Sequence, residues 1–465
     1  MTFKNQIQTS LLICWILILL SINSNFYELN QFYKYKILST ENILNVFNYL
    51  RFYIPFVIVF FLTILFIFIK KKFNYILFLF FIYFFYQFIL IIILNYQINE
   101  TIKVNIGERI KNYQLIASAI STLFIFYCSN ALGLKSFYKN LLLILITFIV
   151  LISIFFTSQL IFEFITEKKL FYIYTSKTLA PEQLTLSQAT PRVTGLSRML
   201  LLIFFLFYFI KLSNPKKKFI KYSSLTILFT CVFFIYGMQS RGSWIGILLI
   251  IFIDIFINKK NLKKTLTILL VIFTAIFFYE INLKIKSYST KIVNTNELNE
   301  LNELNELKKN QERLVSTHST SGRTEIWNNI ITIIKDDKII FGKGPQSDRH
   351  LLTKYLTKNK GHVSFTVYEN NASNALLYSY LCAGIIGFLI LICIYINTIK
   401  LIYINIFIIR NFSSKNILIN FSTITLLYLL IRSIFENSFS LFSVDFVFFI
   451  LSYFIALKKI KYKNK

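Results

Sequence analysis

The sequence predicts an all-α protein, a polytopic membrane helix bundle of about twelve transmembrane helices with a large outer loop that contains amphipathic helices. Of the 465 residues, 56% are apolar and only 15% are charged, whereas soluble domains carry about 25% charged residues. Several apolar runs reach about 15–22 residues, which is the length that crosses the hydrocarbon core of a bilayer. These runs are continuous rather than alternating, which excludes a membrane β-barrel.

The first apolar run begins near Leu11, after Lys4, and no small-residue cleavage site follows it, so we interpret it as a membrane helix rather than a signal peptide. The other runs have the length and composition of membrane helices as well. The expected spans lie near 11–24, 52–69, 73–95, 114–133, 141–162, 199–212, 224–239, 244–257, 265–281, 375–395, 417–433 and 440–457.

The formal net charge of +29 would indicate nucleic-acid binding in a soluble protein. Here the basic residues gather in alternate connections between spans, at 70–72, 215–221, 258–264 and 396–416, and in the C-terminal tail. The positive-inside rule then places these connections and both termini in the cytoplasm. The five cysteines all lie in apolar runs, so we expect neither disulfides nor a metal site.

Two segments on the opposite, outer side are longer than a connection requires, namely 163–198 and about 282–374. Loops of this length in a compact protein are usually functional or disordered. The sequence therefore predicts three parts. They are spans one to nine over 1–281 with a loop near 163–198, a large outer loop over 282–374, and the last three spans with the tail over 375–465.

The large outer loop itself has three parts. The repeat NELNELNELNEL at 296–307 has leucines that drift around a helix, which predicts a solvated spacer. At 324–337, isoleucines share one face at helical spacing, which predicts an amphipathic helix that either lies on the membrane surface or caps the bundle. The glycine-proline sequence FGKGP at 341–345 predicts the turn that ends it.

Four arginines lie at three predicted outer-edge sites, and Arg198, Arg241 and Arg323 are each next to Gly or Ser. Arg241 lies in the short turn SRGSW, Arg323 opens the amphipathic helix, and Arg192 and Arg198 precede the span near 199–212. An arginine at this depth costs free energy unless it reaches lipid headgroups or binds an anion. Headgroup contact explains each arginine alone. Together, the arginines predict one membrane-borne anionic ligand, for which the guanidinium fork is suited.

These motifs resemble, in their order and spacing, the O-antigen ligase/polymerase superfamily of bacterial envelope glycosyltransferases. The resemblance is carried by RVTGLSR before a span, SRGSWIG at the short hairpin, GRTEIW and DDKIIFGKGP in the long loop, and SNALLYSYLCAGIIGFL at the next span. It covers roughly residues 190–390.

The resemblance implies an enzyme of the bacterial inner membrane that takes glycan from an undecaprenyl-diphosphate carrier on the periplasmic face. The acceptor is lipid A–core for a ligase, or another carrier-linked glycan for a polymerase. It also implies that Arg241 and Arg323 contact the diphosphate. Arg192 and Arg198 are further candidates from the pattern of outer-edge arginines. No metal, nucleotide or other cofactor is required, and the sequence contains no DxD pair, P-loop or zinc spacing.

One position departs from the pattern of the ligases, which carry a histidine directly before the asparagine that opens the span after the long loop. This chain has Ser373 before Asn374, and a serine hydroxyl is a poor base near neutral pH. His362, about a dozen residues upstream, and Glu369, in YENNASN, are the alternative candidates for the base. The histidines at 318 and 350 are weaker candidates.

A polysaccharide flippase or transporter is the alternative from another class. Transporters place ionisable residues near the middle of the membrane and often break helices there. The predicted spans contain few acids, Asp254 lies near a cytoplasmic end, and Glu436 and Asp445 lie near an outer edge. The two halves show no repeat, so the sequence favours an enzyme over a transporter.

Overall fold

The computed structural model describes residues 3–21, 40–69, 74–97, 106–133, 137–167, 193–213, 217–238, 240–257, 262–293, 323–337, 339–360, 371–408 and 416–463. Within these residues every regular element is a helix, and nine helices are long and apolar enough to cross a membrane. The all-α membrane fold is therefore confirmed, while the count of twelve spans stays a prediction.

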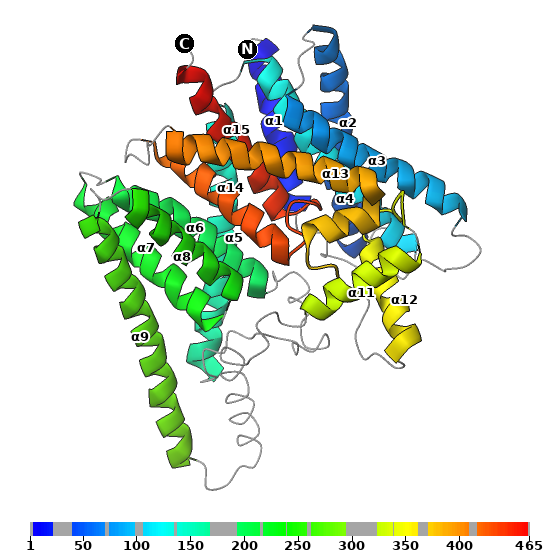
Figure 1. Ribbon diagram of the computed structural model, residues 1–465. Coiled ribbons are helices and arrows are strands. Elements are labelled where there is room, and N and C mark those ends of the chain that lie inside the picture. Colours follow the sequence, from blue (N-terminus) through cyan, green and yellow to red (C-terminus); the bar gives the residue numbers. More distant parts are fainter. Residues whose placement is uncertain are drawn as a thin grey trace. The chain divides into compact units, whose positions relative to one another are not determined.

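The helices follow the predicted runs in chain order (Figure 1). They are α1 (Phe3–Ser21), α2 (Thr40–Ile69), α3 (Tyr75–Gln97), α4 (Ile106–Ala131), α5 (Phe137–Glu167), α6 (Val193–Leu212), α7 (Lys218–Gly237), α8 (Arg241–Ile257), α9 (Leu262–Val293), α11 (Arg323–Asp336), α12 (Ser347–Lys360), α13 (Ala375–Tyr403), the π-helical turn η6 (Ile404–Ile408), α14 (Ile417–Phe435) and α15 (Val444–Lys463).

The chain forms two compact units. The first unit comprises Met1–Leu145, Arg323–Ile409 and Thr425–Lys465, and the second comprises Ile146–Gly322 and Arg410–Ile424. The three-part division at 281 and 374 was drawn along the sequence and stays a prediction.

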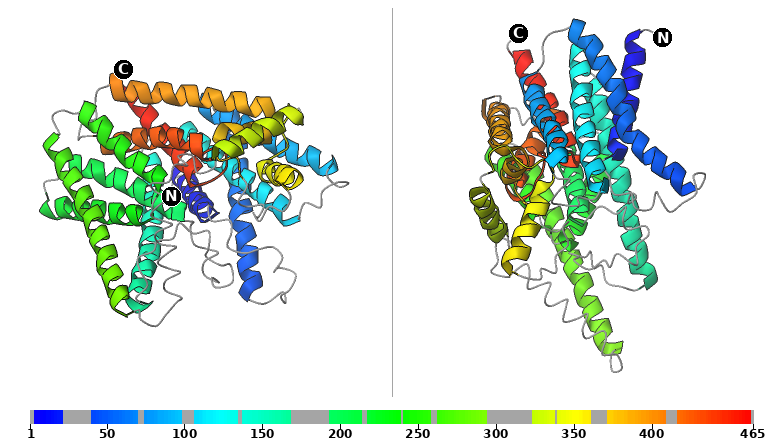
Figure 2. Two further views of the ribbon diagram at one scale, coloured as in Figure 1. Left: turned by 60° about the horizontal axis from the view of Figure 1, so that its bottom comes forward. Right: turned by 90° about the vertical axis from the view of Figure 1, so that its right-hand side faces the viewer.

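Aromatic side chains hold the helices of the first unit together. The ring of Phe126 on α4 stacks on Tyr138 of α5 and on Phe454 of α15. Phe80 on α3 contacts Phe446 of α15 edge to face. Offset and edge-to-face pairs of this kind add stabilisation beyond the area that they bury. Helices α1 and α15 place the two ends of the chain at the same end of this unit (Figures 1 and 2).

In the second unit, α6 packs against α7, α8 and α9, which lie side by side in Figure 1. The apolar window of α6 is 78% buried, whereas that of α9 is 28% buried, so α6 is the central helix of the unit. The one buried acid of α8, Asp254, accepts hydrogen bonds from the hydroxyls of Tyr208 and Thr265. These partners satisfy a polar group that would otherwise be costly in an apolar interior.

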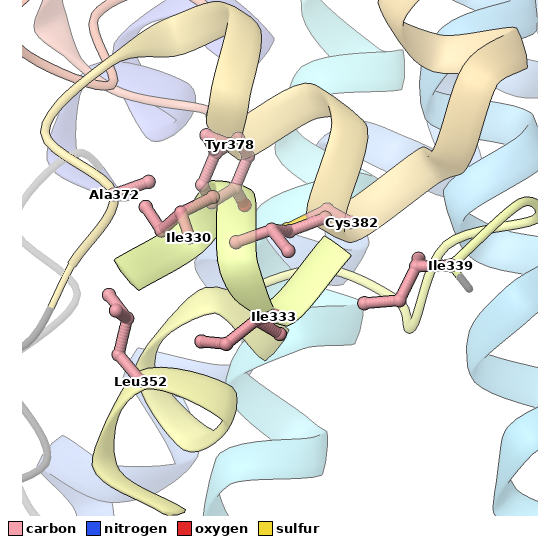
Figure 3. Close-up of a cluster of buried hydrophobic side chains, with 8 residues drawn as sticks. Ile330, Ile333, Ile339, Leu352, Ala372, Tyr378 and Cys382 are labelled. Carbon is pink, nitrogen blue, oxygen red and sulfur yellow. The ribbon is translucent and has the colours of Figure 1, made fainter. Parts of the chain in front are cut away.

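Helix α11 is the amphipathic helix that the isoleucine spacing predicts, and its apolar face is covered by protein. Ile330 and Ile333 are buried in a cluster with Leu352 of α12 and with Tyr378 and Cys382 of α13 (Figure 3). Of the two alternatives drawn from the sequence, the structure therefore supports a helix that caps the bundle through this face.

Helix α13 is interrupted at Gly384, where the 339–346 loop crosses it. Gly384 has φ 61° and ψ −159°, a conformation that is essentially restricted to glycine. The backbone of the loop pairs with the interruption: Lys343 N and Gly344 N donate to the carbonyls of Leu381 and Cys382, and Ile385 N donates to Ile340 O, each at 2.9 Å. This crossing fixes α11 and α12 to one end of α13.

Candidate functional site

Arg323 is the first residue of α11, and its guanidinium forms an ion pair with a carboxylate from the far end of the sequence. Its Nη2 atom lies 2.9 Å from Oε1 of Glu436, just after α14, and both side chains are about one third exposed. Trp327, one turn along α11, packs its ring 6.3 Å from that of Phe435. The start of α11 and the end of α14 therefore form one partly exposed charged site.

Asn374 connects the start of α13 to the same turn after α14. Its side-chain oxygen accepts hydrogen bonds from the backbone N–H groups of Leu376 and Leu377, which caps the helix. Its amide group donates to the carbonyl of Ile434 at 2.9 Å, and its backbone N–H donates to the side chain of Asn437 at 3.1 Å. Residues 371–374 and 434–437 are thus joined beside the Arg323–Glu436 pair.

Asp348 lies beneath this junction, fully buried at the start of α12. Its Oδ2 atom accepts from the backbone N–H of Ala372 at 2.9 Å and from the amide of Asn437 at 3.4 Å. Its Oδ1 atom is buried without a hydrogen-bond partner among the described residues. Burial raises the pKa of this carboxyl, although the hydrogen bonds from Ala372 and Asn437 and the nearby Arg349 act in the opposite direction.

In the second unit, three serines connect two of the arginine motifs. The hydroxyl of Ser197 on α6 donates to Ser240 Oγ at 2.9 Å, and Ser240 Oγ lies 3.0 Å from that of Ser243. Ser197 precedes Arg198, and Ser240 precedes Arg241. The structure therefore brings RVTGLSR and SRGSW together. Arg241 is exposed at the first position of α8, and Arg198 is half-buried.

An aromatic cluster with one carboxylate lies beside the SRGSW turn. The hydroxyl of Tyr236, at the end of α7, donates to Glu280 of α9 at 2.6 Å. The ring of Tyr236 also packs edge-on against Trp244 of α8, at 6.0 Å, and against Tyr279, at 5.3 Å. These contacts hold the end of α7, the start of α8 and residues 279–280 of α9 around the position where Arg241 begins its helix.

Several predicted residues lie outside the described part of the chain, namely Arg192, His362, Glu369 and the histidine at 318. His350 is described and is half-buried on α12. Ser373, in the place of the histidine of the ligases, has φ 46° and donates its hydroxyl hydrogen to Asn371 Oδ1 at 2.6 Å.

Sequence reasoning missed Glu436 as the partner of Arg323, and it missed the buried Asp348. The only sequence signal for Glu436 was its position near the outer end of a predicted span. A pairing between residues 113 positions apart has no local signature, because only the packing of α11 against the end of α14 brings the two side chains together.

Arg241 and Arg323 each occupy the first position of a helix, α8 and α11. The N-terminus of a helix presents free N–H groups and the positive end of the helix dipole, and a guanidinium adds a full charge with forked donors. The first turn of α8 contains no acidic residue that would oppose an anion. At the start of α11, the carboxylate of Glu436, just after α14, lies against the guanidinium of Arg323.

A family model described as O-antigen ligase matches residues 226–392. No curated protein and no solved structure matches the chain. The matched segment contains the SRGSW turn, the helix that Arg323 opens, the 339–346 loop and the Ser373–Asn374 junction. The match covers just over a third of the chain. With the many apolar helices, it indicates a multi-pass protein of the bacterial inner membrane that is similar to the O-antigen ligase family over this segment.

Proposed function

We propose that the protein transfers glycan from an undecaprenyl-diphosphate carrier to an acceptor on the periplasmic face of the membrane, with both termini in the cytoplasm. The acceptor is lipid A–core or another carrier-linked glycan. The observation that carries the proposal is the match over 226–392, which includes Arg241 and Arg323, each at the first position of a helix.

The reaction is a displacement at the anomeric carbon. The oxygen of an acceptor hydroxyl forms a new bond to this carbon, and the bond from the carbon to the diphosphate oxygen breaks. The electron pair leaves with the carrier diphosphate, and the proton of the hydroxyl passes to a base. Guanidinium groups placed in advance stabilise the developing negative charge. The activated diphosphate supplies the free energy of the reaction, so no external cofactor is needed.

In this proposal Arg241 and Arg323 contact the diphosphate, and Arg198 of α6 and Arg192 assist. The Ser197–Ser240 hydrogen bond supports a joint role for the arginines of the second unit, because it holds their two motifs together. Before the diphosphate binds, Arg323 is paired with Glu436, and it must exchange this carboxylate for the diphosphate. Since that pair is partly exposed, its strength is modest, and a diphosphate with more charge competes with the carboxylate.

The base is His362 or Glu369, both of which precede the Ser373–Asn374 junction. The hydrogen bond from Ser373 to Asn371 supports a base other than the serine, because the hydroxyl hydrogen already has a fixed acceptor. Inactivity of Glu369→Gln together with normal turnover of His362→Ala would identify the carboxylate. The reverse result would identify the histidine.

The proposal is tested by glycan transfer in a purified system with carrier-linked glycan as donor. Arg241→Ala and Arg323→Ala are each expected to lower the rate by about 10²–10³, which is the usual cost of removing one group that stabilises developing charge. Lys335→Ala removes an exposed positive charge from the last turn of α11 and is expected to leave the rate unchanged. Full activity of either arginine variant would refute the diphosphate contacts.

Ligation and polymerisation give different products in cells. A deletion strain that loses all capped polysaccharide indicates a ligase, whereas one that retains only single-unit capped product indicates a polymerase. Ser373, in place of the histidine of the ligases, is the feature that favours the polymerase. Movement of labelled carrier across the membrane without any new glycosidic bond would instead support a flippase.

A further inference from the structure

The 339–346 loop carries an apolar tip that faces away from the protein. Ile340 is 56% exposed and Phe341 is 67% exposed. Next to them, beyond the interruption in α13, Ile385 and Leu389 are also exposed. The only charged residue in the loop is Lys343. Exposed apolar patches that continue onto a membrane helix are typical of surfaces that contact lipid.

Two hydrogen bonds place the loop beside the membrane-crossing part of its neighbours. The hydroxyl of Tyr86 donates to the carbonyl of Phe341 at 2.8 Å. Tyr86 lies inside the apolar window Tyr75–Ile93 of α3, and it is about 10 Å from the Ile93 end at 1.5 Å per residue. The amide of Asn112 donates to Pro345 O at 3.3 Å, and Asn112 begins the apolar window of α4.

The depth of the loop changes along it in a consistent order. Pro345 contacts the end of the α4 window, whereas Phe341 contacts the interior of the α3 window. The hydrogen bonds to α13 follow the same order along the loop. Ile340 O accepts from Ile385 N, after the interruption, and Gly344 N donates to Cys382 O, before it. Ile340 and Phe341 therefore lie further along the neighbouring spans than Gly344 and Pro345 do.

Part of the backbone of the loop meets the condition that a bilayer imposes. Irregular backbone at membrane depth must have its polar groups satisfied by protein. The carbonyls of Ile340, Phe341 and Pro345 accept the bonds described above, and the N–H groups of Lys343 and Gly344 donate to α13. At the base of the loop, the N–H of Gln346 donates to the hydroxyl of Tyr378 at 3.3 Å.

We propose that residues 339–346 form a re-entrant loop in the bilayer, and that Ile340 and Phe341 at its tip contact the acyl chains of membrane lipids. The side chain of Lys343 extends from the same loop to the headgroups, as amphipathic side chains at an interface do. This lipid contact does not depend on the reaction that the protein catalyses.

The proposal also divides α13 into two parts of different role. Residues before Gly384 pack against α11 and α12 through Tyr378 and Cys382. The hydrocarbon-crossing part runs from Ile385 to the end of η6 at Ile408, about 36 Å at 1.5 Å per residue, which is enough to cross the bilayer. The predicted span near 375–395 is then displaced toward the C-terminus.

The experiment places the photo-crosslinking amino acid p-benzoylphenylalanine at position 341 in the full-length protein. The protein is reconstituted in nanodiscs of phosphatidylethanolamine and phosphatidylglycerol, and lipid adducts are measured by mass spectrometry. Position 389, exposed on α13 after the interruption, is the lipid-facing control, and position 328, exposed on α11, is the aqueous control. An aromatic replacement of an exposed phenylalanine preserves the fold.

Lipid adducts at position 341 are expected to be within about threefold of those at 389 and at least tenfold above those at 328. A yield at 341 equal to that at 328 would overturn the proposal. A second nanodisc sample also contains undecaprenyl phosphate. Adducts at 341 made only with this prenyl lipid, when it is present, would refute contact with bulk lipid in favour of a binding surface for the carrier.

A second measurement needs no crosslinker. In the same nanodiscs, Phe341→Cys is expected to react with a membrane-impermeant maleimide at least tenfold more slowly than Asn328→Cys. The five native cysteines are buried or half-buried, and the unsubstituted protein gives the background. Equal labelling rates for the two variants would show that the loop tip lies in water and would refute the proposal.

Discussion

Replacing Gly384 with alanine is expected to destabilise the protein by about 2.5–7.5 kcal/mol, because two costs add at this position. The first is conformational: a side chain at φ 61° and ψ −159° costs about 1–3 kcal/mol. The second is steric, since an added Cβ atom would lie 2.5 Å from Phe341 C and 2.7 Å from Gly342 N, and closer still to Ile340 O.

The steric conflict cannot be relieved by a side chain, because the opposing atoms are backbone. The loop must move away, and three hydrogen bonds between the loop and α13 are then lost or lengthened. Each such bond contributes about 0.5–1.5 kcal/mol to stability. With the backbone strain, these losses give the expected total.

Gly133 supplies a matched control. It follows α4 with φ 65°, and an added Cβ atom there would meet nothing within 4 Å. Gly133→Ala therefore carries only the conformational cost, about 1–2 kcal/mol. The assay is the loss of monodisperse protein on heating in one detergent. Gly384→Ala is expected to melt clearly below Gly133→Ala, and equal melting temperatures would refute the crossing of the loop over α13.

Three further predictions concern the junction around Arg323. Burial raises the pKa of Asp348, so the charged form is less stable in the folded protein; stability should decrease as the pH rises above about 4, and Asp348→Asn should remove this decrease without lowering stability at pH 7. Asn374→Ala removes a helix cap and the bond to Ile434, and should cost about 1–3 kcal/mol. Glu436→Gln should cost less than about 1 kcal/mol, because its pair with Arg323 is partly exposed.

Thermal melting as a function of pH checks all three substitutions. A decrease in stability of Asp348→Asn at pH 7 would show that the carboxylate charge is needed by a partner. An unchanged melting temperature for Asn374→Ala would refute the junction between residues 371–374 and 434–437. A loss of several kcal/mol in Glu436→Gln would show that the ion pair is structural rather than open to exchange with a ligand.

Much of the fold was predictable, because a bilayer imposes strong constraints on sequence. A membrane helix must form its backbone hydrogen bonds within itself and present apolar side chains over about 20 residues. Each apolar run in the sequence therefore shows this requirement by itself. The apolar face of α11 was also predictable, since Ile330 and Ile333 recur at helical spacing. The residues that cover the apolar face of α11 could not be predicted, because they come from α12 and α13.

The arginine motifs were predictable as residue types at helix starts, but their partners were not. The positions of RVTGLSR and SRGSW in the sequence do not predict the hydrogen bond between Ser197 and Ser240. Likewise, the sequence FGKGP predicts a turn, but it does not predict that the backbones of Gly342 and Gly384 lie in direct contact. Such a contact depends on two segments that are separated by a whole helix.

The sequence by itself determined that this is a membrane-embedded helical protein with motifs that resemble those of O-antigen ligases, because hydrophobic length and short motifs are local properties. Only the tertiary structure decided that α13 is broken, that its break is closed by the 339–346 loop, and that Arg323 is paired with Glu436. Those features arise from contacts between segments that are distant in the sequence. Backbone groups and charges removed from water need partners, and the packing of the helices decides which groups are near enough to serve.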